Sequence, residues 1–371
     1  MKWSWKIGRI AGIDVFVHWT FLLLVGWILV ARIGSGETAA SALKAVAFLL
    51  AIFACVLLHE LGHALMARRY RITTRDITLL PIGGVARLER MPDAPLQELA
   101  VALAGPAVNV VIAATLAAGL ALSNQLASVH ELDLRDGSPV NQLLTINVIL
   151  VIFNLLPAFP MDGGRVLRAI LATRLEYVRA TQIAATIGQG MAVIFGVFGF
   201  FYQPLLMFIA LFVYLGAQAE AHHAEVRSLM RGVPVREAMV TRFKALAESD
   251  QLSTAVTEVL SGQQQDFPVT DDDRVVGLLL RADLVKALAE TGPATLVGRV
   301  MKRELSMASD AEMLEGIFDR MRQTAQAAMP VQRQGKLVGM ITLENVGEWM
   351  MINNALRRSH SRGSIEDIFR G

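Results

Sequence analysis

The sequence predicts a membrane-embedded all-α bundle of about six transmembrane helices, with a membrane-associated β-hairpin, followed by a soluble α/β domain. Hydrophobic residues make up 54% of the 371 residues and charged residues only 18%, whereas soluble proteins carry about a quarter charged residues. The long apolar runs all lie within residues 1–222, and residues 231–353 contain an internal repeat. We therefore expect a membrane half and an aqueous half.

Six apolar segments are each long enough to form a spanning helix, which takes about 20 residues. The expected spans are Val15–Ile33, Leu43–Ala67, Leu99–Leu122, Val140–Phe159, Ile183–Phe201 and Leu205–Ala221. Between the second and third spans, Ile72–Glu89 is too polar to cross a membrane, and its pattern predicts a strand, a Pro/Gly turn and a second strand. We expect this hairpin to dip toward the membrane, where non-helical backbone must be covered by protein or line a wet cavity.

Basic residues gather on one side of the predicted spans. They are Lys2, Lys6 and Arg9 before the first span, Arg68, Arg69, Arg71 and Arg75 after the second, and Arg165, Arg168, Arg174 and Arg179 after the fourth. The positive-inside rule then places both termini in the cytoplasm, so we expect a multi-pass protein of the cell (inner) membrane, in contact with lipid. The net charge of +2 gives no reason to expect a nucleic-acid partner.

The second span contains the pattern H-E-x-x-H as His59-Glu60-Leu61-Gly62-His63. Residues four apart share one face of a helix, so both imidazoles can bind one metal ion while Glu60 reaches a water molecule beside it. Histidine and glutamate are expensive inside a bilayer and usually mark a functional site. The alternative is a pair of core histidines whose nitrogens are satisfied by neighbouring backbone.

A catalytic zinc site needs a third protein ligand and an open position. Asp162 is the candidate, because it follows the Pro-interrupted end of the fourth span, and Arg68 and Arg165 place it at the same membrane face as His63. An aspartate before Gly163-Gly164 is also a common turn residue. The spacing alone leaves both interpretations open.

Three motifs together resemble those of the site-2 proteases, which are intramembrane zinc metalloproteases. They are the H-E-L-G-H segment, the segment Gly105-Pro106-Ala107-Val108-Asn109, and N-L-L-P-x-x-P-x-D-G-G-R at residues 154–165. The resemblance covers residues 1–222 in motif order and number of spans.

The resemblance implies that His59, His63 and Asp162 bind one Zn2+ per chain and that Glu60 is the catalytic acid and base. It also implies that Asn109 lies near the zinc ion and polarises the scissile carbonyl, although a helix-packing amide is the alternative. The implied substrates are single-span regulatory membrane proteins. The implied role of the hairpin is to pair with an unwound substrate as an added strand.

His18, near the start of the first span, also has two interpretations. It could serve as a fourth ligand or a plug of the metal site, or it could be an interfacial histidine beside Trp19 in an aromatic belt.

The soluble part is divided into a linker at 223–234, repeats at 235–288 and 297–353, and a tail at 354–371. The repeats resemble a pair of CBS domains, in which a G-h-h-[ST]-x-x-D segment commonly holds the ribose and phosphate of a nucleotide. The first copy keeps Gly277 and Asp283 but has leucine at the hydroxyl position, and the second keeps Gly339 and Thr342 but has Asn345 at the acidic position. ATP or another adenine nucleotide is therefore one expectation. A purely structural role, or a homodimer formed through the CBS pair, is the other.

Two functions of different classes fit these observations. One is an intramembrane zinc metalloprotease with a regulatory CBS pair. The other is a CBS-regulated ion channel or transporter, in which buried His, Glu and Asp side chains form an ion path. The feature that separates them is a glutamate next to a two-histidine metal pair, which transport does not require.

Overall fold

The computed structural model describes residues 3–92, 94–123, 138–262, 264–272, 274–324 and 326–368, with side chains as far as residue 356. It divides into two compact units, Met1–Ala224 and Glu225–Gly371. Part of the predicted tail at 354–371 lies outside the described residues.

Seven helices are described in the first unit, the last of which continues into the second. They are α1 (Trp19–Gly34), α2 (Ala39–Arg69), α3 (Pro95–Leu122), α4 (Pro139–Asn154), α5 (Asp162–Ala172), α6 (Tyr177–Tyr202) and α7 (Pro204–Met230). Among the described helices, α2, α3, α6 and α7 are long and apolar enough to cross a membrane, so the chain is a membrane protein. Helices α1 and α4 have 16 residues each, fewer than the roughly 20 of a full span, and a total of six spans stays a prediction.

The first predicted span is wrong at its start. Residues Ile13–His18 form strand β2, and the helix begins only at Trp19. The physical reason is a two-residue period that the apolar count hides: Ile13, Val15 and Val17 are buried while their neighbours are partly exposed. The fourth span also ends early, at Asn154, before the proline-containing loop that leads to α5.

A four-stranded sheet in the order β1-β2-β3-β4 accompanies the helices. Its strands are β1 (Ser4–Ile10), β2 (Ile13–His18), β3 (Thr74–Leu80) and β4 (Gly83–Leu88). The predicted hairpin is present as antiparallel β3 and β4, whereas its parallel pairing with the N-terminal strand β2 was not predicted. Strand β4 ends the order and is therefore an edge strand.

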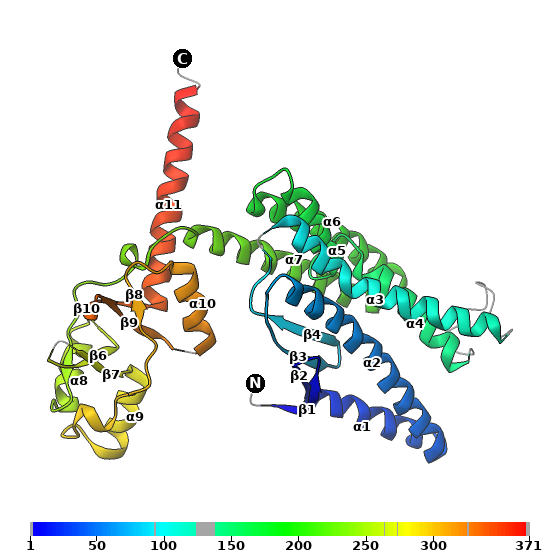
Figure 1. Cartoon of the computed structure of the whole chain (residues 1–371), viewed down its shortest axis with the longest axis horizontal. Coiled ribbons are helices and arrows are strands. Elements are labelled where there is room, and N and C mark those ends of the chain that lie inside the picture. The colour runs from blue at the N-terminus through cyan, green and yellow to red at the C-terminus, as the bar shows by residue number, and fades with distance from the viewer. Residues whose placement is uncertain are drawn as a thin grey trace. The chain divides into compact units, whose positions relative to one another are not determined.

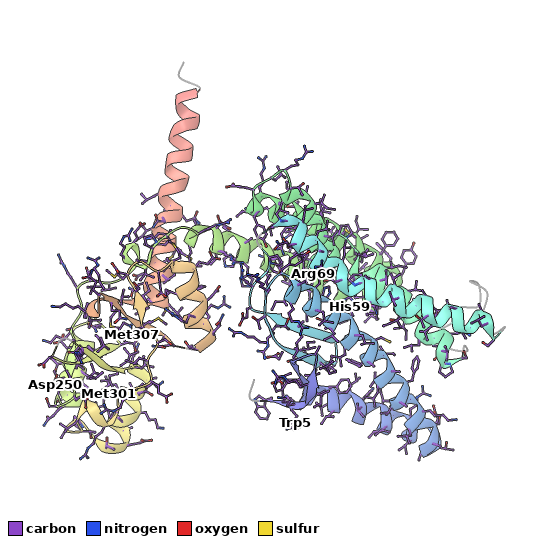
Figure 2. All side chains as sticks on the ribbon, in the orientation of Figure 1. Trp5, His59, Arg69, Asp250, Met301 and Met307 are labelled. Atoms are coloured by element: carbon purple, nitrogen blue, oxygen red, sulfur yellow. The ribbon has the colours of Figure 1, made fainter. Side chains whose placement is uncertain are left out.

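Helix α2 packs against α3 and against strands β3 and β4 (Figure 1). Gly62 permits the close approach to α3, since a Cβ atom there would lie 2.8 Å from the carbonyl oxygen of Ala104. At the end of α2, Arg68 donates to the carbonyl oxygen of Ala11 at 2.9 Å. Figure 2 shows His59 and Arg69 on this one helix.

The second unit contains two three-stranded sheets of the same pattern, a parallel pair followed by an antiparallel hairpin. Its elements are β5 (Leu246–Ala247), α8 (Leu252–Leu260), β6 (Phe267–Asp271), β7 (Arg274–Leu279), α9 (Arg281–Thr291), β8 (Ala308–Ser309), α10 (Leu314–Thr324), β9 (Ala328–Arg333), β10 (Lys336–Thr342) and α11 (Leu343–Ile368), with short 3₁₀ turns at Val235–Glu237 and Val297–Arg299.

The two repeats interlock through reciprocal backbone hydrogen bonds. Val240 and Met340 exchange two of them, at 2.8 and 2.9 Å, and Leu278 and Lys302 exchange two, at 3.0 and 2.9 Å. Each bridge joins the start of one repeat to the hairpin of the other, so the repeats form one folded unit.

Close packing of α6 on α7 generates a prediction about stability. A Cβ atom at Gly199 would lie 2.7 Å from the backbone nitrogen of Met207, whereas one at Gly190, on the same helix, would meet nothing within 4 Å. We expect Gly199→Leu to lower the stability by about 1–3 kcal/mol through overpacking and Gly190→Leu to change it little. Thermal unfolding in detergent measures both variants, and equal midpoints would contradict the packing of this helix pair.

Candidate metal centre

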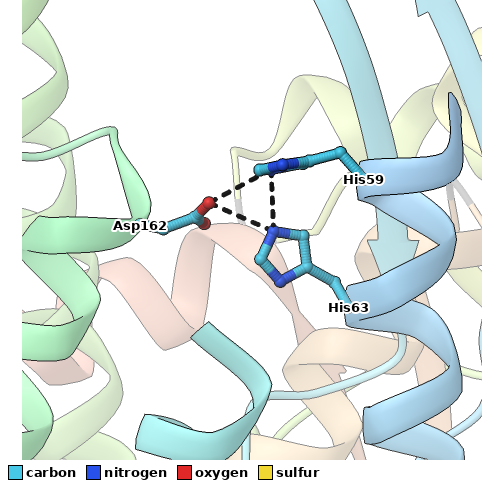
Figure 3. A group of neighbouring side chains, drawn as sticks. All are labelled: His59, His63 and Asp162. Carbon is cyan, nitrogen blue, oxygen red and sulfur yellow. Dashed lines mark hydrogen bonds and ion pairs between the residues drawn. The ribbon is translucent and has the colours of Figure 1, made fainter. Parts of the chain in front are cut away.

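Three buried side chains from two helices meet at one point in the first unit. His59 and His63 project from the same face of α2, and Asp162 projects from the first turn of α5 (Figure 3). Their exposed fractions are only 6%, 6% and 7%. The two histidine Nε2 atoms are 3.1 Å apart, and Asp162 Oδ2 lies 3.2 Å from His59 Nε2 and 3.1 Å from His63 Nε2.

The other ring nitrogen of each histidine contacts a hydrogen-bond acceptor on α3. Nδ1 of His63 lies 2.7 Å from the carbonyl oxygen of Val101, and Nδ1 of His59 lies 2.5 Å from Oδ1 of Asn109. A carbonyl oxygen only accepts hydrogen bonds, so both Nδ1 atoms donate. In the neutral imidazoles, the Nε2 atoms then carry lone pairs.

The orientation of the Asn109 amide follows from a chain of hydrogen bonds that ends on the backbone. Nδ2 of Asn109 donates to Oδ1 of Asn147 at 2.8 Å, and Nδ2 of Asn147 donates to the carbonyl oxygen of Leu143 at 2.8 Å. Because Leu143 supplies an acceptor, each amide in the chain has a defined direction. The oxygen of Asn109 therefore faces His59.

Three acceptor atoms consequently lie within 3.2 Å of one another in a buried site. One added proton can bridge only one pair of these atoms, whereas one metal ion satisfies all three. Tetrahedral zinc with bonds of about 2.0–2.1 Å separates its ligands by roughly 3.3 Å. The two-histidine, one-carboxylate donor set and its spacing thus fit the predicted zinc ion.

A cavity of about 470 Å³ opens beside the three ligands. Glu60 and Arg165 line it, together with residues 82–86 of the hairpin. The carboxylate of Glu60 accepts a hydrogen bond of 3.0 Å from the backbone nitrogen of Ala86 on the edge strand β4. The predicted acid–base residue therefore lies between the metal ligands and an exposed strand.

Asn109 occupies a different position from the one that a carbonyl-polarising residue needs. It is fully buried, its oxygen is used by His59 and its nitrogen by Asn147. It is not among the described residues that line the cavity. This arrangement favours a role in orienting the His59 ring.

His18 lies at the N-cap of α1, where its Nδ1 contacts the hydroxyl of Thr20 at 2.8 Å. It does not belong to the cavity lining among the described residues, which favours the interfacial interpretation.

Arg165 was not singled out as a functional residue from the sequence. It lines the cavity, and its Nε atom is buried without a hydrogen-bond partner in the described part of the chain. The signal that could have identified it is its spacing, since it follows Asp162 by three residues and so lies one helical turn away.

The residues proposed to bind a nucleotide fall into two groups. Thr342 and Asn345 line a cavity of about 510 Å³, where they also bond to each other at 2.6 Å across the start of α11. Asp283 instead forms an ion pair of 3.4 Å with Lys302.

The two glycines of the repeat motifs allow close packing between the repeats. A Cβ atom at Gly277 would lie 2.2 Å from Sδ of Met301, and one at Gly339 would lie 2.6 Å from Sδ of Met239. Their smallness therefore has a structural explanation independent of any ligand.

Comparisons with known proteins agree with both halves of this architecture. Residues 47–134 and 127–195 match Peptidase family M50, and residues 235–290 match the CBS domain family. Zinc metalloprotease MJ0392 of Methanocaldococcus jannaschii is 32% identical over 354 residues, which cover 95% of this chain and 97% of that protein. Stage IV sporulation protein FB of Bacillus subtilis is 29% identical over 191 residues, covering 49% of this chain and 62% of that protein.

A solved structure of a site-2 protease from Methanocaldococcus jannaschii is 37% identical with a TM-score of 0.43, covering 59% of this chain and 95% of that chain. The likeness in sequence to a zinc metalloprotease along nearly the whole chain favours the enzyme over an ion channel. The chain belongs to Peptidase family M50, the site-2 protease family of zinc metalloproteases, and it carries CBS domains.

Proposed function

We propose that this enzyme hydrolyses peptide bonds within or near the transmembrane segments of single-span regulatory membrane proteins. The observation that supports it most is the meeting of His59, His63 and Asp162 beside Glu60, in a cavity bordered by an edge strand. His59, His63 and Asp162 hold the zinc ion, and Glu60 is the acid–base residue.

The chemistry divides between the metal and the chain. When bound, zinc lowers the pKa of a water molecule toward about 7 and polarises the scissile carbonyl. Glu60 takes the proton from the attacking water and returns it to the leaving amine. Arg165, which lines the same cavity and has a buried Nε without a described partner, is the candidate donor to the oxyanion that forms.

A substrate strand pairs with the edge of β4 in this proposal. A helix hides its carbonyl groups in i to i−4 hydrogen bonds, so a transmembrane substrate must unwind before attack. An unwound segment gains backbone hydrogen bonds by adding to a sheet edge. Its carbonyl oxygen would replace Glu60 as the acceptor of the Ala86 N–H and thereby free the glutamate for proton transfer.

Gly105 on α3 lets the two imidazoles pack directly against the helix backbone. A Cβ atom at this position would lie 2.2 Å from Nε2 of His63 and 2.7 Å from Nε2 of His59. Any larger residue would therefore displace the rings from the positions in which they meet Asp162.

The enzyme is oriented, in this proposal, with both termini in the cytoplasm of the cell, as the basic loops predict. The CBS pair then lies in the cytoplasm, where it can sense a soluble nucleotide and can pair with a second copy of the chain.

We further propose an adenine nucleotide as the ligand of the cavity that Thr342 and Asn345 line. Three carboxylates, of Asp266, Glu344 and Glu348, line this cavity with one guanidinium, that of Arg242, among the described residues. The acidic balance disfavours a ligand with several phosphates.

The role of Glu60 is tested by Glu60→Gln, which preserves size and removes the proton acceptor. We expect zinc content to be retained and cleavage of a transmembrane substrate to fall by about 10²–10⁴-fold. Metal analysis and a cleavage assay in detergent measure the two quantities. Glu89→Gln, an exposed carboxylate just after β4, is the control that keeps activity. Wild-type activity in Glu60→Gln would refute the proposed role.

The metal site is tested by Gly105→Ala. The added methyl group overlaps the imidazole of His63 and crowds that of His59, so the rings must move and we expect the purified variant to lose most of its zinc. Gly119→Ala is the matched control on the same helix, because a Cβ atom there meets nothing within 4 Å. A Gly105→Ala protein with one zinc ion per chain would contradict the site.

The nucleotide site is tested by isothermal titration of the whole protein with AMP and ATP at equal ionic strength. We expect AMP to bind several-fold more tightly than ATP because three carboxylates repel extra phosphates. Asn345→Ala should weaken the binding of AMP and the binding of ATP. Tighter binding of ATP, or binding unchanged by Asn345→Ala, would argue against this ligand and site.

A further inference from the structure

Arg168 is a charged side chain held in the interior of the first unit, outside the metal centre. Only 2% of the residue is exposed. Its Nε donates to Oε1 of Glu98 at 2.8 Å, its Nη2 lies 2.5 Å from the same oxygen, and its Nη1 donates to Oε2 of Glu220 at 3.1 Å. Burial of such a group costs free energy unless it is paired and hydrogen-bonded.

Two aromatic rings complete the surroundings of this guanidinium. Its central carbon lies 5.0 Å from the ring centroid of Phe159 and 5.0 Å from that of Tyr177. These distances fall in the range of cation–π contacts. Two carboxylates and two rings therefore hold the guanidinium in one place.

The ion pair with Glu98 joins α3, which accepts hydrogen bonds from both histidine rings, to α5, which carries Asp162. Glu98 lies on α3 one turn before Val101, whose carbonyl oxygen accepts from His63, and the same helix carries Asn109, which orients His59. Arg168 lies on α5, the helix that begins at Asp162.

Asp162 is the first residue of α5, and the first turn of this helix packs directly on the loop before it. A Cβ atom at Gly163 would lie 2.2 Å from the carbonyl oxygen of Leu156, and one at Gly164 would lie 2.6 Å from the nitrogen of Phe159. A shift of α5 along its axis would therefore carry the carboxylate with it.

We propose that Arg168 is a positioning residue for the metal centre, which sets the distance between the Asp162 carboxylate and the two imidazoles through its ion pair with Glu98. This inference rests on the proposed function only in that the three side chains bind zinc. Replacement of a buried ion pair by well-packed apolar residues is often neutral or stabilising, so stability alone is weak evidence for the role of these charges. The ion pair does fix the spacing between α3 and α5.

The test compares zinc affinity, measured by competition with a chelator, in four purified full-length variants. Arg168→Met removes the charge and leaves Glu98 unpaired. Arg168→Lys keeps the charge and loses the planar fork. The double variant Glu98→Gln with Arg168→Met removes the guanidinium and its buried partner Glu98, and it leaves only Glu220, whose side chain is 30% exposed, without an ion pair. We expect this variant to fold, because it buries no unpaired carboxylate as deep as Glu98. Arg303→Met breaks the exposed pair with Glu248 in the second unit and is the control.

We expect Arg168→Met and the double variant to bind zinc about 10–100-fold more weakly, the usual effect of removing a residue that orients ligands. The zinc affinity of Arg168→Lys should lie between the affinities of these two variants and that of the wild type. The zinc affinity of Arg303→Met should equal that of the wild type. The absorption bands of the cobalt-substituted protein should shift in the double variant, because they report ligand geometry.

A folded double variant with wild-type zinc affinity and an unchanged cobalt spectrum would overturn the positioning role and leave the proposed function intact. A wild-type protein that binds no zinc would overturn the proposed function itself. The two failures are therefore distinguishable.

Discussion

The contact on which the rest of the first unit depends is the meeting of three acceptor atoms, two imidazole nitrogens and a carboxylate oxygen, within 3.2 Å. Such a group is repulsive in a buried site unless a cation lies among its members. The helix period brings His59 and His63 to one face of α2, and hydrogen bonds from α3 direct their Nε2 lone pairs inward. A metal ion held by these three side chains would both join α2 to α5 and supply the chemistry of the site.

Each of the surrounding helices makes a different contribution to this contact. Helix α3 accepts hydrogen bonds from the Nδ1 atoms of both histidines, and its Glu98 forms the ion pair with Arg168. Helix α5 presents Asp162 and carries Arg165 into the cavity. Arg168 also contacts Glu220 on α7, so its guanidinium joins three helices of the first unit.

Much of the site was predictable from the sequence because its signals are local. The four-residue spacing of His59 and His63 implies one helix face. The proline-rich break implies that the fourth helix stops near it, although the helix ends at Asn154 and not at the predicted Phe159. The spacing could not decide between turn and ligand for Asp162, since that depends on a contact across 99 residues with His63. The partners of Asn109 and Arg168 are also distant in sequence, since Asn147 is 38 residues from Asn109 and Glu98 is 70 residues from Arg168. The strand at Ile13–His18 is hidden inside an apolar run.

The most direct test of this account is X-ray absorption at the zinc edge of the purified, full-length protein. The account predicts one zinc ion per chain with about two imidazole nitrogens and oxygen ligands, at roughly 2.0–2.2 Å. A thiolate sulfur ligand at roughly 2.3 Å would contradict it, as would purified wild-type protein without zinc.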